Sequence, residues 1–368
     1  MWTFYDQYLR SFYKRYPQVT KSLYKNQMEC LLNDYFDWPG RLIPYFRKSG
    51  HQADLIVTNA HQTQLAWAKE NDFFVTGPNW EVDIVKAQIK QYRPDILWGN
   101  LTPMYAGILP EIRSFCGCCV AWRGAVLDKL FDLSSLDCIL VHNPNELIRY
   151  RAIGKRSEQF FPCFEPAILD LLPSASPDIS ISFVGSYFPV HARRVELLLY
   201  LVQQQIPIEL WGNGLLPEIT GIKPWRIRSL LLQAKKLNHN CPLLQRYRGQ
   251  AWGLDMFKIL KRSKITLNIH GDTETGKVPT NMRLFEAMGV GTLTFTEATP
   301  NLADLFEPEK QLVTFIERED LQKKIRYYMQ HDDEGQAIAK AGQEQIMRKH
   351  TAEIRSSQLL ELFEDIRS

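Results

Sequence analysis

The chain has 368 residues, of which 45% are hydrophobic and 12% aromatic, and it carries 44 basic against 41 acidic side chains. This apolar content supports folded cores and excludes a mainly disordered or collagen-like chain. The length suits two domains of roughly 100–200 residues each. A formal charge of +3 gives no support for a nucleic-acid-binding protein, which would concentrate Lys and Arg on one face.

Several features predict a cytosolic protein. The longest stretch without a charged residue runs from Ile96 to Pro110 and is shorter than the ~18–20 apolar residues of a membrane span. Asp6 and Arg10 interrupt the amino-terminal segment where a signal peptide needs an apolar core. The seven cysteines are odd in number and irregularly spaced, which predicts buried free thiols rather than disulfides or a four-ligand zinc site.

From Asp54 onward, apolar runs of strand length alternate with amphipathic helical stretches, which predicts an α/β protein built of βαβ units. In the first half we expect strands at 2–5, 54–59, 95–98, 118–122 and 137–141, and helices at 62–70, 81–91, 109–115 and 145–150. After a Pro- and Ser-containing linker at 172–178, strands are expected at 179–184, 208–211, 264–269 and 291–295. The helices expected there span 192–204, 254–261, 281–288, 301–306, 319–330, 334–349 and 351–366.

Two successive α/β domains would leave a cleft between them, and ligands of open parallel sheets bind at the carboxyl ends of the strands. Residues that follow strands are therefore the candidates for a functional site. A less regular stretch, Leu215 to Arg248, gathers Arg226, Arg228, Lys235, Lys236, Arg246 and Arg248. It is either a solvated helix and loop or an insertion that faces an anionic ligand.

The segment from Ile265 to Phe295 is the most informative. A buried strand leads into a polar loop with His270, Gly271 and Asp272, and the next helix begins at Thr280 or Asn281. The free N–H groups and the dipole of a helix start attract anions, so a pyrophosphate could bind there.

Side chains near that helix start support the same interpretation. Asn281, Met282 and Arg283 lie closest to it, and Arg283 could bond a phosphate. Glu286, one and a half turns further on, could accept hydrogen bonds from ribose hydroxyls. The alternative is an ordinary capped helix with Glu286 on a solvated face.

Two other strand ends could contribute to the same ligand site. Gly185 and Ser186 let a ligand approach the backbone, and Arg193 and Arg194 open the next helix. Glycines beside tryptophans could form a slot for a nucleobase, and a packed turn is the equally plausible alternative. These glycines and tryptophans are Trp211, Gly212, Gly249 and Trp252.

Candidate general bases lie in the first half of the chain. His61 and His142 each follow an expected strand, and imidazole has an unperturbed pKa near 6.5. Asp6, after the expected strand at 2–5, is the third candidate. The sequence contains no D-x-D pair of the kind that holds a metal in many sugar transferases, and no GxxxxGK[ST], GxSxG or HExxH motif.

Four motifs together resemble the CgeB-type (spore maturation protein) glycosyltransferases of the group-1 glycosyltransferase clan. They begin at Tyr247 (YRGQAWGLDM), Ile265 (ITLNIHGD), Asn281 (NMRLFEAMGVG) and Pro300 (PNLADLFEP). The resemblance implies the GT-B fold, with an acceptor-binding Rossmann-like domain at 1–172, a nucleotide-sugar-binding one at 173–350, and a final helix, 351–368, that packs back on the first domain. Glu286 matches the clan's ribose-binding glutamate. Val278 stands where many retaining members carry another glutamate, which leaves the anomeric outcome open.

We therefore expect a metal-independent glycosyltransferase that moves a sugar from a nucleoside diphosphate, UDP or GDP, without a further cofactor. Arg194 and the helix start at Asn281 would offset charge on the leaving diphosphate. The acceptor could be a glycan, a lipid-linked glycan, a protein or a small molecule, and basic patches would allow peripheral contact with an anionic membrane. The alternatives are a non-catalytic GT-B binding or scaffold protein and a GT-B sugar-nucleotide epimerase.

Overall fold

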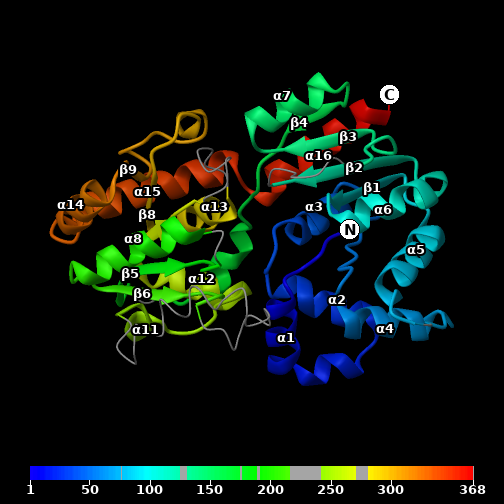
Figure 1. Ribbon diagram of the computed structural model, residues 1–368, viewed down its shortest axis with the longest axis horizontal. Coiled ribbons are helices and arrows are strands. Elements are labelled where there is room, and N and C mark those ends of the chain that lie inside the picture. Colours follow the sequence, from blue (N-terminus) through cyan, green and yellow to red (C-terminus); the bar gives the residue numbers. More distant parts are fainter. Residues whose placement is uncertain are drawn as a thin grey trace. The chain divides into compact units, whose positions relative to one another are not determined.

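The computed structural model describes residues 1–75, 77–124, 131–174, 176–188, 191–215, 242–270 and 281–367. They form two compact units, Met1–Pro162 with Ala352–Ser368 and Cys163–Thr351, which we call unit 1 and unit 2. Each contains a parallel β-sheet with helices, so the predicted α/β class is confirmed (Figure 1).

Unit 1 is built on a four-stranded sheet in the order β1-β2-β3-β4. Its strands are β1 (Ile96–Asn100), β2 (Cys118–Arg123), β3 (Cys138–Val141) and β4 (Ser157–Gln159), and all neighbouring pairs are parallel. Its helices are α1 (Asp6–Arg15), α2 (Tyr24–Asn33), α3 (Ile43–Lys48), α4 (His61–Glu70), α5 (Trp80–Tyr92), α6 (Pro103–Ile112), α7 (Pro144–Ala152) and α16 (Ala352–Arg367), with 3₁₀ turns at Pro17–Lys21, Pro39–Leu42 and Arg113–Phe115. The final helix, α16, contacts α3, and Glu353 pairs with Lys48 at 3.1 Å.

The amino-terminal segment extends this sheet beyond β1. The backbone N–H of Asn100 donates to Met1 O at 3.1 Å, and Trp2 forms a parallel bridge with Val57. The expected strands at 2–5 and 54–59 are therefore wrong as regular strands, because each contributes only this one bridge among the described residues.

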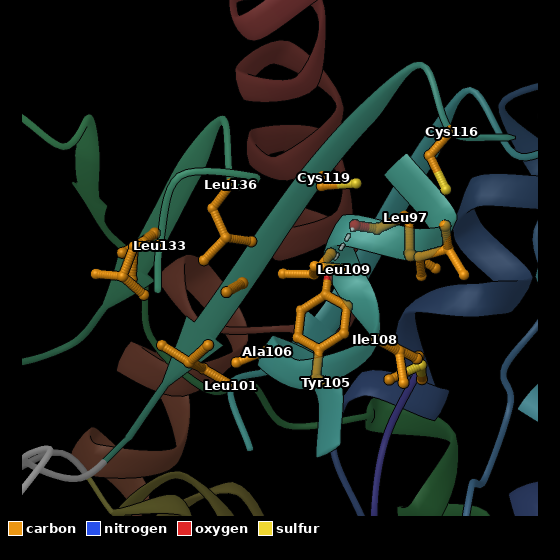
Figure 2. Close-up of a cluster of buried hydrophobic side chains, with 14 of the residues drawn as sticks. Leu97, Leu101, Tyr105, Ala106, Ile108, Leu109, Cys116, Cys119, Leu133 and Leu136 are labelled. Atoms are coloured by element: carbon orange, nitrogen blue, oxygen red, sulfur yellow. Dashed lines mark hydrogen bonds between the residues drawn. The ribbon is translucent and has the colours of Figure 1, made fainter. Parts of the chain in front are cut away.

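The core of unit 1 explains why the apolar runs became strands. Leu97, Cys119, Ala121 and Ile139 alternate inward from β1, β2 and β3 and pack against α6. Tyr105 of α6 lies among them, and its hydroxyl donates to Leu97 O at 3.1 Å, as Figure 2 shows, and is 3.0 Å from Val120 O. The buried phenol is thus fully satisfied by the sheet backbone.

Cysteines follow the prediction with one exception. Four are buried free thiols, namely Cys116, Cys118, Cys119 and Cys138; Cys163 is also buried, whereas Cys30 is exposed on α2. Cys241 lies outside the described residues.

Unit 2 is built on a five-stranded parallel sheet in the order β6-β5-β7-β8-β9. The strands are β5 (Ile179–Val184), β6 (Ile208–Trp211), β7 (Ser263–Asn268), β8 (Leu293–Glu297) and β9 (Val313–Phe315). The helices are α8 (Ala192–Gln203), α11 (Pro242–Arg246), α12 (Gly253–Lys261), α13 (Met282–Gly289), α14 (Arg318–Tyr328) and α15 (Asp332–Lys349), with 3₁₀ turns at Pro166–Leu171 and Leu302–Asp304.

The structure corrects one expected helix in each unit. The helix expected at 301–306 is only the 3₁₀ turn Leu302–Asp304, because Pro300 and Asn301 form a turn before it. In unit 1, the helix expected at 109–115 begins earlier, at Pro103, and passes through Pro110. No described helix is both long and apolar enough to cross a bilayer.

Candidate functional site

The carboxyl ends of three adjacent strands in unit 2, β5, β7 and β8, bring together charged residues from separate parts of the sequence. Arg194 on α8 is buried, with 7% of its surface exposed, and it bridges two of these ends. It donates to Ser186 O at 2.8 Å after β5 and to Ile269 O at 2.7 Å after β7. The guanidinium therefore holds the two loops together and places a positive charge at the edge where parallel sheets bind ligands.

Glu297, the last residue of β8, is a second charged group at this edge, and the sequence alone did not single it out. One carboxylate oxygen accepts the backbone N–H of His270 at 2.8 Å, and the other pairs with Arg193. Burial raises the pKa of Glu297, while the His270 N–H and the arginines oppose that rise. The His270 ring lies 3.2 Å from the Thr296 hydroxyl, so the carboxyl ends of β7 and β8 are joined by side chains.

The start of α13 has the form expected of an anion site. Asn281 is the N-cap residue, yet its side chain makes no capping hydrogen bond, and its Oδ1 is buried without a partner. The orphan backbone N–H groups of a helix start need partners from elsewhere, and an anionic ligand can supply them.

Glu286 lies inside α13 with only 1% of its surface exposed. The alternative interpretation, a glutamate on a solvated helix face, is therefore wrong. Its carboxylate accepts from Arg283 at 2.9 Å, and Arg283 also contacts the Met256 sulfur of α12. A buried carboxylate with an arginine partner beside a helix start suits a ligand that carries both hydroxyls and phosphates.

The glycine and tryptophan candidates have structural roles in the described residues. Gly212 has φ +140°, and a Cβ there would lie 1.6 Å from Gly185 O, so the two loops pack too closely for any side chain. Trp211 is buried, and its carbonyl accepts from the Tyr187 hydroxyl at 3.1 Å. Gly249 O accepts the Gly212 N–H at 2.9 Å, and Trp252 is the N-cap residue of α12. This geometry matches the packed-turn alternative.

Other predicted residues fall outside the described ranges. They are Gly271, Asp272 and Val278, together with Arg226, Arg228, Lys235 and Lys236 of the basic stretch. Of that stretch, Arg248 is described, and it pairs with Glu209 at 2.9 Å.

The three candidate bases lie at the carboxyl edge of unit 1 but not in one place. Asp6 begins α1 and accepts from the Asn59 amide at 3.0 Å, while His61 begins α4 two residues after Asn59. His142 follows β3, and β1 and β2 lie between it and the other two. With strands spaced roughly 4.8 Å apart, His61 and His142 are separated by about 19 Å across the sheet, so they cannot serve one acceptor hydroxyl together.

Among the residues that the structure describes, no three His, Cys, Asp or Glu side chains converge as ligands for a metal ion. The positive groups at the unit 2 edge are arginines and a helix start, which can bind a diphosphate by hydrogen bonds and charge alone.

Residues 193–361 match the family model described as "Glycosyl transferase-like". No curated protein sequence matches the chain. Solved structures with a similar fold are GT-B glycosyltransferases, so the chain has the GT-B fold of two Rossmann-like domains.

Three of these structures show the extent of the likeness. HepE of Anabaena, in complex with UDP and glucose, has a TM-score of 0.61 and 13% identity, over 88% of this chain and 95% of its own. A glycosyltransferase from Rickettsia africae has a TM-score of 0.58 and 12% identity, over 89% and 93%. Sucrose-phosphate synthase from Thermosynechococcus elongatus has a TM-score of 0.56 and 16% identity, over 78% and 77%.

Proposed function

We propose that the protein is a metal-independent glycosyltransferase of the CgeB type, which moves the sugar of a UDP-sugar or GDP-sugar onto an acceptor hydroxyl and releases UDP or GDP. The observation that carries this proposal is the buried Glu286, paired with the half-buried Arg283, beside the uncapped start of α13. The match to the glycosyltransferase-like family, which includes this segment, and the UDP and UDP-glucose in the HepE structures support it.

The roles follow from the chemistry of each group. Glu286 accepts hydrogen bonds from the two ribose hydroxyls, and the N–H groups at the start of α13 donate to the diphosphate. Arg194, held by two backbone carbonyls, stabilises the negative charge that grows on the leaving diphosphate as the glycosidic bond breaks. Because these positive groups are preorganised, the transfer requires no divalent cation in this proposal.

The acceptor hydroxyl must lose a proton during transfer, and unit 1 offers two separate places for a base. Asp6 and His61 share one part of the edge, and His142 occupies another. Substituting His61 or His142 by Ala should abolish transfer for only one of them and spare nucleotide binding in both. The free thiols fit a cytosolic location, which we retain as part of the proposal.

A nucleotide titration tests the donor site. Thermal unfolding is measured with UDP, GDP, TDP, CDP and ADP in EDTA, then again with Mg²⁺. One nucleotide should raise the unfolding midpoint in EDTA, because a ligand that binds only the native state adds about 2.7 kcal/mol at 100 times its Kd. Glu286→Ala should lose this response, whereas Glu344→Ala, on an exposed part of α15, should keep it.

Each alternative gives a different result in this experiment. A response that appears only with Mg²⁺ would refute metal independence. No response to any nucleotide would refute the glycosyltransferase proposal, and an equal response in Glu286→Ala would refute the role of Glu286. Incubation with the sugar conjugate of the nucleotide that binds then separates an enzyme from a binding protein. Only an enzyme would release free sugar from it or transfer the sugar to an added acceptor.

A further inference from the structure

Glu297, the last residue of β8, is a buried carboxylate at the edge of unit 2 that is proposed to bind a diphosphate. Only 5% of its surface is exposed, and the roles given above to Glu286, Arg194 and the start of α13 do not include it. Acidic side chains are almost never buried unless they are paired, and a negative charge at an anion site weakens the binding of the anion. The contacts of Glu297 therefore bear on how strongly this edge holds a diphosphate.

The two carboxylate oxygens contact two segments that border the proposed diphosphate site. One oxygen, Oε2, accepts the backbone N–H of His270 at 2.8 Å, just after β7. The other, Oε1, pairs with Arg193 in the first turn of α8. Glu297 thus engages one backbone donor and one guanidinium, and both are groups that can also donate to a phosphate.

The two arginines at the start of α8 differ in how they are held. Arg194 is buried and donates to Ser186 O at 2.8 Å and to Ile269 O at 2.7 Å, so its guanidinium is fixed by the backbone. The Arg193 side chain is 59% exposed and pairs with the carboxylate of Glu297. An exposed arginine can exchange one anionic partner for another at little desolvation cost. Arg193 is therefore the group for which Glu297 and a bound phosphate would compete.

The Glu297 carboxylate also lies within electrostatic range of the charge that a diphosphate would bring. Arg194, which is proposed to stabilise the leaving diphosphate, is close enough to Glu297 that its charge lowers the pKa of that carboxyl. Because Glu297 is buried, solvent and salt screen its charge less than they screen a surface carboxylate. A phosphate bound by Arg194 would therefore be repelled by Glu297.

The two nucleotides that a transferase binds differ in their charge at this group. The diphosphate of a sugar nucleotide is esterified at both ends and carries about two negative charges. The free nucleoside diphosphate released after transfer has a terminal phosphate with a second pKa near 6, so it carries about one more negative charge at neutral pH. A fixed carboxylate beside the site repels the released nucleotide more strongly than the sugar nucleotide.

We propose that Glu297 is a specificity-determining residue that weakens the binding of the free nucleoside diphosphate relative to the sugar nucleotide. This inference rests on the proposed function and assigns Glu297 a part in releasing the product, a step that often limits turnover. The negative charge supplies the discrimination, both directly and by pairing with Arg193. The hydrogen bond from the His270 N–H is a separate, positioning role of the same side chain.

The test is isothermal titration calorimetry of the full chain in EDTA with two pairs of ligands, UDP with UDP-glucose and GDP with GDP-glucose. Glu297→Gln removes the charge and keeps an oxygen that can accept the His270 N–H. This variant should bind the free nucleoside diphosphate about five- to tenfold more tightly than the parent chain, because the repulsion is lost, whereas the Kd of the sugar nucleotide should change by less than about twofold. Glu344→Gln, at an exposed position of α15, removes the same charge elsewhere and should leave both Kd values unchanged.

Arg193→Gln provides a second variant at a mostly exposed side chain, which avoids a buried substitution. Without this guanidinium, the Glu297 charge is less compensated. The Kd of the free nucleotide should therefore rise by a larger factor than that of the sugar nucleotide. Adding Glu297→Gln to Arg193→Gln should reverse this change in the ratio of the two Kd values.

A purely structural role of Glu297 predicts different results. Glu297→Ala removes the acceptor of the His270 N–H together with the charge, so its unfolding midpoint should fall below that of Glu297→Gln. If Glu297 only held the loop, both variants would weaken the two nucleotides of a pair by the same factor. A Kd ratio in Glu297→Gln equal to that of the parent would overturn the proposal.

The outcomes also separate this inference from the proposed function. A parent chain that binds none of the four nucleotides would refute the donor site and the role of Glu297 together. A parent that binds a pair, with equal tightening of both members in Glu297→Gln, would leave the donor site standing and refute the discrimination. Selective tightening of the free nucleotide in Glu297→Gln, reversed in sign in Arg193→Gln, would support both.

Discussion

Replacing His142 by Asn should remove a specific part of the acid sensitivity of unit 1. Burial lowers the pKa of His142 from 6.5 to about 4, so the folded state resists protonation of the ring while the unfolded state does not. The free energy of unfolding is therefore affected little above pH 7, and it decreases as the pH falls through 6.5 toward 4. For that shift in pKa, His142 lowers the free energy of unfolding by about 0.2 kcal/mol at pH 7 and by about 2 kcal/mol at pH 5.

Urea unfolding at pH 7, 6 and 5 measures this effect, followed by tryptophan emission because Trp2, Trp38, Trp98 and Trp122 lie in unit 1. Carboxylates also titrate in this range, so the informative quantity is the difference in the free energy of unfolding between the parent chain and His142→Asn. Between pH 7 and pH 5, this difference should change by about 1.8 kcal/mol in favour of the variant. His51→Asn, at an exposed position of the same unit, is the control and should show no change. A difference that stays constant with pH would show that the His142 ring is solvated.

Two further substitutions test the unit 2 edge. Arg194→Met should destabilise unit 2 by about 3 kcal/mol in urea unfolding, because the carbonyls of Ser186 and Ile269 lose a charged donor, and an unchanged midpoint would contradict its bridging role. Gly212→Ala should lower the free energy of unfolding by more than about 3 kcal/mol, since its Cβ would overlap Gly185 O. Gly154→Ala is the control in the same assay. Gly154 also has a positive φ, but no atom lies within 4 Å of its added Cβ, so this change should lower the free energy of unfolding by about 1 kcal/mol.

Much of the α/β framework could be predicted because buried parallel strands are short runs of branched residues. Cys118 to Trp122, Ile179 to Val184 and Ile208 to Trp211 stand out in this way, and each is a strand in the structure. Strands β4 and β9 were missed because each has only three residues, too few for a recognisable period. The segment around Val57 looks like a strand by composition, but its pairing depends on the distant Trp2.

The unit 2 site could be predicted in part because its signal is local. A helix start after a polar loop, with Arg283 and Glu286 three residues apart, is visible along a single stretch of chain. Glu297 was missed because its importance depends on the neighbouring position of β7 and β8, which brings it to the His270 N–H. The tertiary arrangement also explains why Glu286 is buried, which helical periodicity alone did not indicate.

Unpartnered polar atoms also mark the candidate site of unit 2. Asn281 Oδ1, at the N-cap of α13, and Thr299 Oγ1 and Asn301 Oδ1, which follow β8, are buried without partners. The two amide oxygens accept hydrogen bonds, and the threonine hydroxyl can donate or accept one. These atoms suit the hydroxyls of a ribose or a sugar, whereas a diphosphate, which only accepts hydrogen bonds, needs the arginines and the helix start. The two kinds of group together match the two halves of a sugar nucleotide.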